Sequence, residues 1–222
     1  MPVDELHREV AAVALAAAAR HGFALGGGNA LIAHGIVDRP TEDVDLFTNE
    51  DGGVAAAADS VERALRAAGF EAERQDRLGD LAEVIYGADD GLAEWIVTAP
   101  GGGQMMLQIA HIDRGRRPVI MDVGPVLAIE DVIGSKICAL ASRAEVRDFV
   151  DTAAALQRYS VDQLIGLARR LDPGLADQDF ADAGRRLDRL SDSVFARYGL
   201  SPADVAQLRE RLAGWPRTAA PR

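Results

Sequence analysis

Two short segments decide the fold of this chain: residues 25–31, which read LGGGNAL, and residues 39–47, which read RPTEDVDLF. The apolar run 23–25 predicts a strand and residues 29–34 a helix, so the glycines form the turn between them. Glycine lets backbone come close to a ligand, and a helix start directs free N–H groups outward, which suits a phosphate. On its own, such a turn also fits a flexible connection without a ligand.

The second segment carries two carboxylates that are two residues apart. In a strand, residues i and i+2 point to one face, so Asp43 and Asp45 share a side while Val44 and Leu46 are buried on the other. Like charges this close repel each other unless a cation lies between them. Mg²⁺ commonly takes one or two carboxylates together with substrate phosphates, which is what nucleotidyl transfer needs. A lone Asp-x-Asp also fits a solvated strand end, but the glycine turn upstream favours the metal.

The elements on either side follow from apolar periodicity, caps and glycine or proline punctuation. Strands are expected at 44–47, 70–75, 81–86, 93–98 and 104–112. Helices are expected at 4–20, 51–68, 129–142, 146–159, 161–171, 176–190 and 202–212. The chain is therefore of the α+β class: a core of strands and helices over residues 1–124, then a helical part over residues 125–222 that contributes to the active site.

Composition limits the setting and the partners. The chain has 222 residues and no apolar run of about 18 or more, so we expect no membrane span. One cysteine and the lack of a recognisable signal peptide fit a cytoplasmic protein. The net charge of −11 repels phosphate backbones, so an RNA substrate needs a local basic patch. Arg114, Arg116 and Arg117 form one candidate, which also fits a solvated turn, and Arg143 with Arg147 form another.

Residues 130–143, which read EDVIGSKICALASR, contain Lys136, the only lysine beside 23 arginines. A lysine in an otherwise apolar helix can contact a β- or γ-phosphate as a compact charge, although an exposed helix position is the simpler alternative. Further along, Arg147 and Asp151 have the i, i+4 spacing of an ordinary helical ion pair. Asp148 falls outside that pair, so it is free to face the site.

Together these blocks resemble the AbiEii/AbiGii toxin family, which includes the mycobacterial MenT toxins. That family belongs to the polymerase-β-like nucleotidyltransferase superfamily. The resemblance covers roughly residues 23–156 and rests on the glycine turn, the Thr41-x-Asp43-Val44-Asp45 block, the Lys136 helix and Arg147-Asp148. It implies a polymerase-β-like core with a mixed sheet followed by a helical C-terminal part.

The resemblance also implies roles for individual residues. Gly27, Gly28, Asn29, Arg39 and Lys136 would bind the nucleotide, and Asp43 and Asp45 would hold Mg²⁺ or Mn²⁺. The catalytic set would comprise Asp43, Asp45, Lys136 and Asp148. Relatives of this kind add nucleotides, preferably pyrimidines, to the 3′ end of tRNA and so block translation, and a cognate antitoxin accompanies them.

The sequence departs from the superfamily at two points. Gly28 stands where many nucleotidyltransferases have serine, which removes one hydroxyl contact to phosphate. The strand around Gln108 lacks the usual third carboxylate; Asp113 is the nearest candidate, and it also fits a turn residue. The attacking hydroxyl would then be deprotonated by Asp148 or through the metal alone. Two other interpretations stay open, namely transfer to a small molecule or a protein hydroxyl, and a non-catalytic binding module.

Overall fold

A computed structural model describes residues 5–75 and 91–219, and the chain packs into two compact units. Unit 1 comprises Met1–His34 and Pro40–Ala128, and unit 2 comprises Gly35–Arg39 and Ile129–Arg222. The chain thus leaves unit 1 for five residues, Gly35–Arg39, and returns to it. The expected strand at 81–86 lies outside the described residues. Among the described helices, none is both long and apolar enough to cross a bilayer.

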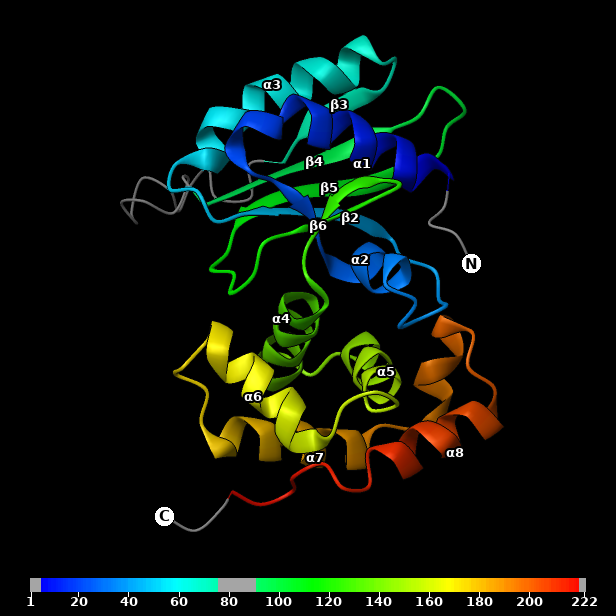
Figure 1. The fold of residues 1–222 in the computed structure, drawn as a ribbon. Helices are drawn as coiled ribbons and strands as arrows, with labels where there is room; N and C mark the ends of the chain where they lie inside the picture. The colour runs from blue at the N-terminus through cyan, green and yellow to red at the C-terminus, as the bar shows by residue number, and fades with distance from the viewer. Residues whose placement is uncertain (1–4, 76–90, 220–222) are drawn as a thin grey trace. The chain divides into compact units, whose positions relative to one another are not determined.

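Unit 1 is built on a seven-stranded sheet with the order β3-β4-β5-β2-β1-β7-β6 (Figure 1). Strand β2 pairs in parallel with β5, and β1 with β7, whereas the other neighbours are antiparallel, so the sheet is mixed. The strands are β1 Ala24–Leu25, β2 Asp43–Thr48, β3 Glu71–Arg74, β4 Leu92–Thr98, β5 Gln104–His111, β6 Val119–Met121 and β7 Gly124–Val126.

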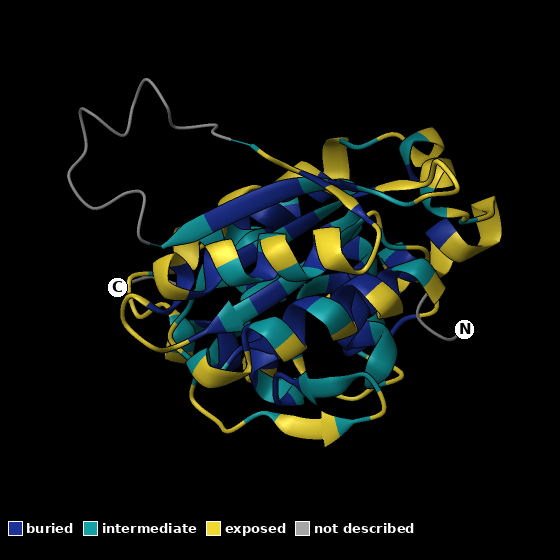
Figure 2. Ribbon diagram, turned by 90° about the horizontal axis from the view of Figure 1, so that it is seen from above, coloured by how far each residue is buried: buried dark blue, intermediate teal, exposed yellow. Residues whose placement is uncertain are grey.

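One face of this sheet is covered by α1 (Glu5–Ala17) and α3 (Gly53–Ala67), and α2 (Gly27–Ala33) lies on the other (Figure 1). The alternation of β2 sends Val44 and Leu46 into the layer below α1 and α3, where both are fully buried. Figure 2 looks onto these two helices from above, and their exposed residues line the outer side. The second face of the sheet therefore carries the polar residues of β2.

Unit 2 is helical. It contains α4 (Ile129–Ser142), α5 (Val146–Ala155), α6 (Val161–Leu171), α7 (Asp177–Arg189), the 3₁₀ segment Asp192–Tyr198 and α8 (Pro202–Arg211). Phe149, Phe180 and Phe195 are almost fully buried in its core. Gly134 lets α4 approach α6 closely, because a Cβ there would lie 3.0 Å from the Leu167 carbonyl oxygen.

The α+β class with a mixed sheet is confirmed. Helices α4 and α6 have the predicted bounds, whereas α2 begins at Gly27, two residues earlier than expected. The short strands β6 and β7 were not predicted, and neither was the 3₁₀ segment before α8. The basic residues 114–117 lie in a turn that is largely exposed, with Arg114 donating to the Gly22 carbonyl at 2.9 Å.

Candidate active site

The glycine turn of unit 1 lies against the carboxylate of Asp45. Gly26 caps α2 and donates its N–H to the Asp45 carbonyl at 2.8 Å. Gly27 has a φ of 57°, in the left-handed region, and a Cβ there would overlap Asp45 Oδ2. The absence of a side chain at Gly27 is therefore what makes room for the Asp45 carboxylate beside the turn.

Asp43 and Asp45 share the face of β2 that α1 and α3 do not cover. Both are half-buried, in alternation with the buried Val44, Leu46 and Thr48, as the period of two predicts. Within the described part of the chain, no group of three or more histidine, cysteine, aspartate or glutamate side chains is arranged to hold a metal. Two carboxylates completed by substrate phosphates suit Mg²⁺, so the residues present fit that ion.

Asn29, which the resemblance places among the nucleotide-binding residues, has a clear structural role. Its Nδ2 donates to the Asp43 carbonyl at 2.7 Å, and its Oδ1 accepts from Thr41 Oγ1 at 3.0 Å. The side chain is 1% exposed. These bonds tie α2 to the segment that enters β2 and so position Asp43; a direct contact to nucleotide stays a prediction.

The strand register shows where a third carboxylate would lie. Met106 and Gln108 of β5 stand opposite Asp43 and Asp45, and neither is acidic. Asp113 is exposed and lies five residues beyond Gln108, which corresponds to about 16 Å of extended chain. Glu94 of β4 stands opposite Gln108 and is buried, so the row Asp45, Gln108, Glu94 crosses three strands on one face.

Unit 2 holds a buried ionic cluster around Asp151. Arg39 donates to both carboxylate oxygens of Asp151, at 2.7 and 2.8 Å, and Lys136 Nζ lies 3.2 Å from Oδ2. The side chain of Asp151 is fully buried, and that of Lys136 is 14% exposed. The expected Arg147–Asp151 pair is therefore wrong; Arg147 lies 3.0 Å from Glu145 instead. The alternative of an exposed Lys136 is also excluded.

This cluster joins one carboxylate to two cations, and buried charges are tolerated when they are paired in this way. A bidentate arginine fork fixes Asp151, which in turn holds the Lys136 ammonium in place. A pre-positioned cation of this kind suits an anionic ligand such as a triphosphate.

Asp148 has contacts of a different kind. It accepts from the Glu145 N–H at 3.0 Å and from Arg143 Nε and Nη2 at 3.1 and 3.2 Å, and it is fully buried. The first contact is half of the capping box that starts α5. These contacts make Asp148 a capping residue of unit 2, and its expected catalytic role stays a prediction.

Asp151 is the residue that sequence reasoning missed. The i, i+4 rule assigned it to Arg147, and that assignment concealed a partner 112 positions away. One signal was present: Asp148, Asp151, Thr152 and Ala155 follow the helical period and are all buried. A carboxylate on the buried stripe of an amphipathic helix requires a cationic partner.

A strand, a glycine turn and a helix, followed by a strand with two carboxylates on one face, form the arrangement that the resemblance to nucleotidyltransferases predicts. The sequence profile of "Nucleotidyl transferase AbiEii toxin, Type IV TA system" matches residues 11–217. The chain thus belongs to the AbiEii family of nucleotidyltransferase toxins. No curated protein sequence is similar enough to this chain to count as a relative.

Solved structures show the same fold at low sequence identity. MenT4, a nucleotidyltransferase toxin from Mycobacterium tuberculosis, is 17% identical with a TM-score of 0.60, over 94% of this chain and 82% of that one. JHP933 from Helicobacter pylori is 15% identical with a TM-score of 0.57, over 94% of this chain and 88% of that one. The core of unit 1 and the helices of unit 2 both fall within these matches.

Proposed function

We propose that this nucleotidyltransferase transfers a nucleotide from a nucleoside triphosphate to the 3′ end of tRNA, and that this blocks translation. The observation that carries the proposal is the Asp45 carboxylate seated against Gly27 at the start of α2. A carboxylate and a helix start in contact with each other suit a metal-bound triphosphate. The family membership and the MenT4-like fold support the toxin role.

The reaction joins a hydroxyl oxygen of the acceptor to the α-phosphorus of the donor. The bond from that phosphorus to the bridging oxygen breaks, pyrophosphate leaves, and the hydroxyl proton passes to water or to a carboxylate. Asp43 and Asp45 would hold Mg²⁺ or Mn²⁺, which neutralises charge on the phosphates when bound. The turn at Gly27 and Gly28 would bind phosphate through backbone N–H groups.

Lys136 is proposed to bind the triphosphate, with Arg39 and Asp151 fixing its position. Its ammonium has three N–H groups, of which one faces Asp151. Lys136→Ala should therefore raise the KM for the nucleotide and lower the rate. The measurement is nucleotide titration of the transfer reaction, and an unchanged KM and rate would refute the role.

Three further features of the proposal come from the family resemblance. The donor is a pyrimidine nucleoside triphosphate, the protein is silenced by a cognate antitoxin, and it acts in the cytoplasm. Donor preference follows from comparing the four nucleotides in the same transfer assay.

The deciding experiment incubates the protein with total tRNA, Mg²⁺ and each labelled nucleoside triphosphate in turn. Asp45→Asn serves as the control, because it keeps the shape of the side chain and removes the charge that holds the cation. We expect label on tRNA from one or two nucleotides, and a loss of at least about a thousandfold in the variant, as for removal of a group that stabilises the transition state by ~4 kcal/mol.

Other outcomes separate the alternatives. Mg²⁺-dependent nucleotide binding without label on tRNA would move the acceptor to a small molecule or a protein hydroxyl. The surplus negative charge of the chain, −11, favours a cationic acceptor in that case. Failure to bind nucleotide at all would indicate a non-catalytic binding module, and labelling that survives Asp45→Asn would refute the proposed metal site.

A further inference from the structure

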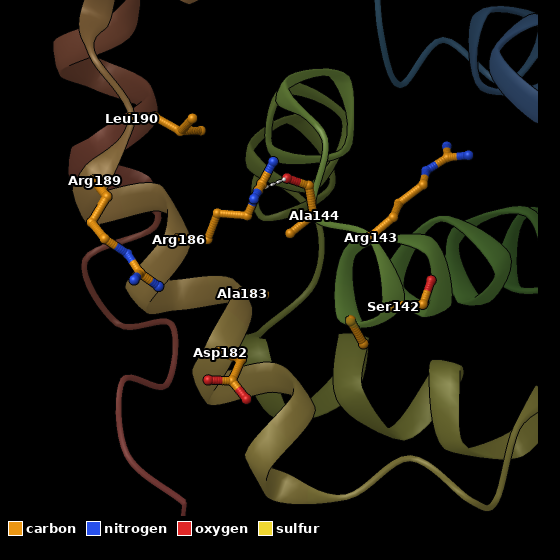
Figure 3. Close-up of a pocket in the computed structure, with 9 residues that line it drawn as sticks. Ser142, Arg143, Ala144, Asp182, Ala183, Arg186, Arg189 and Leu190 are labelled. Carbon is orange, nitrogen blue, oxygen red and sulfur yellow. Dashed lines mark hydrogen bonds between the residues drawn. The ribbon is translucent and has the colours of Figure 1, made fainter.

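Unit 2 contains a hollow with a volume of about 580 Å³, formed where α4 ends and α7 passes by (Figure 3). This volume is within the usual range of ligand pockets. The hollow has a cationic lining of three arginines and one acid, in addition to small and apolar residues. It is lined by Ala141, Ser142, Arg143, Ala144, Asp182, Ala183, Arg186, Arg189 and Leu190.

The charges of this lining do not cancel. Asp182 bonds to Arg185, which does not line the hollow, and Arg143 is held by Asp148. In the part of the chain that the structure describes, no ion pair joins Arg186 or Arg189 to a carboxylate. Two exposed guanidinium groups thus border one hollow of unit 2 without a salt bridge to an acid. A hydrogen bond from Gln178 and, to a smaller extent, the charge of Arg189 hold the pKa of Asp182 below its usual range, so the lining is partly balanced on that side. The lining still has a surplus of positive charge, which attracts an anion.

Backbone contacts hold the two arginines in place. Arg186 Nε donates to the Ala144 carbonyl at 2.8 Å, a bond drawn in Figure 3. Ala144 has a φ of 48° and is the single left-handed residue other than glycine among the described residues. The direction of its carbonyl is therefore set by an uncommon backbone conformation. Arg189 Nε donates to the Arg185 carbonyl at 3.2 Å. In both side chains Nε donates to a backbone carbonyl, and the terminal Nη groups can donate to a ligand. Arginine forks of this kind match phosphate oxygens.

The distribution of charge favours a nucleic-acid ligand here. Unit 1 contains 9 arginines against 20 acidic residues, which accounts for the whole net charge of −11. Unit 2 contains 15 basic and 15 acidic residues and is neutral. A phosphate backbone is therefore repelled by unit 1 as a whole but not by unit 2, where a local cluster of arginines can attract it.

We propose that this hollow, bordered by Arg186 and Arg189, binds a phosphodiester of the RNA acceptor. The inference rests on the proposed function in taking RNA as the acceptor, but it concerns binding and not transfer. The sites differ in kind: the Asp151 cluster is a buried pair of cations on one carboxylate, whereas the hollow presents exposed arginine forks.

The test measures the affinity of the full-length protein for total tRNA without nucleotide, by fluorescence anisotropy over a range of salt concentrations. Arg189→Gln leaves the Arg186–Ala144 bond intact and should weaken binding about fivefold. Arg186→Gln combined with Arg189→Gln should weaken it at least tenfold. The slope of log affinity against log salt should fall by about 0.7–0.9 for each phosphate that the variant no longer neutralises. Arg170→Gln, on an exposed residue outside the hollow, is the matched control and should change affinity less than twofold.

The single variant keeps the test valid if the double variant does not fold. Wild-type affinity and salt slope in Arg189→Gln would overturn the inference, as would equal losses in Arg189→Gln and Arg170→Gln. Binding of labelled polyglutamate that depends on Arg189, with no binding of RNA, would also overturn it and assign the hollow to an acidic protein partner. Transfer is measured in a separate assay. If RNA binding depends on Arg189 but no nucleotide is transferred, the proposed function is refuted and this inference is not. If nucleotide is transferred but the variants bind RNA as the wild type does, this inference is refuted and the proposed function is not.

Discussion

At the scale of single residues, Gly27 and Asp45 give the sharpest prediction. Gly27→Ala should destabilise unit 1 and impair transfer, because the new methyl group would overlap the Asp45 carboxylate and the φ of 57° disfavours a side chain. The left-handed backbone alone costs about 1–2 kcal/mol. Urea unfolding and the rate of transfer measure the two effects.

Gly52→Ala is the matched control for this change. Gly52 has a φ of 69°, close to that of Gly27, but a Cβ there would meet nothing within 4 Å. Both variants therefore carry similar backbone strain, and only Gly27→Ala displaces the carboxylate. If the two variants lose the same stability and both transfer nucleotide at the wild-type rate, the contact between Gly27 and Asp45 has no functional consequence.

Asp151 and Asp188 allow a comparison of one ion pair in two environments. Both accept an arginine fork, but Asp151 is buried and shared with Lys136, whereas Asp188 is half exposed beside Arg217. Asp151→Asn leaves Arg39 and Lys136 without their common anion and should lower the free energy of unfolding by about 3–5 kcal/mol. Asp188→Asn should lower it by at most about 1 kcal/mol. Urea unfolding at neutral pH measures the loss of stability in each variant. Comparable losses in Asp151→Asn and Asp188→Asn would mean that the charge of Asp151 does not stabilise the cluster.

At the scale of elements, a substitution of Asp148 tests whether this residue at the start of α5 has a structural or a catalytic role. Asp148→Asn removes the charge facing Arg143 but keeps an oxygen that can accept from the Glu145 N–H. We expect a loss of about 1–3 kcal/mol of stability, as for a hydrogen-bonded charge, and a kcat within a few-fold of wild type. Ser160→Ala, which removes the cap of α6, is the control and should cost about 1 kcal/mol without a change in kcat. A folded Asp148→Asn variant with transfer as low as that of Asp45→Asn would show that Asp148 belongs to the catalytic set.

The elements also show what local sequence information can predict. Helices α4 and α6 are long and periodic, and Ser160 caps α6 with Gln163, so their bounds are visible in the sequence. Strands β6 and β7 are three residues each, too short for any period, and they form only because β7 pairs with β1 about a hundred residues earlier. Their pairing is a property of the assembled sheet.

The same distinction applies to the candidate site. The shared face of Asp43 and Asp45 follows from strand period, which is local. The partners of Asp151 come from Arg39 and Lys136, and only the assembled unit 2 brings them together. The row of Asp45, Gln108 and Glu94 could not be predicted from the sequence either, because it depends on the pairing of β5 with both β2 and β4.

At the scale of the whole molecule, charge is segregated between the units. Unit 1 holds the Asp43–Asp45 pair and all of the net negative charge, so it attracts cations such as Mg²⁺ and repels itself. Unit 2 is neutral and holds the Asp151 cluster and the arginine hollow. The proposed metal site and the proposed phosphodiester site thus lie in units of different net charge.

This segregation predicts that salt stabilises the two units unequally. Each unit has one buried tryptophan, Trp95 in unit 1 and Trp215 in unit 2, so Trp215→Phe and Trp95→Phe leave one fluorescent reporter each. Raising NaCl from ~0.05 to ~0.5 M shortens the Debye length to about 4 Å and screens the repulsion within unit 1. The thermal midpoint reported by Trp95 should rise by about 3 °C more than that reported by Trp215, which for domains of this size corresponds to under ~1 kcal/mol. Equal shifts would mean that the units unfold as one, or that the surplus charge does not act on unit 1 alone.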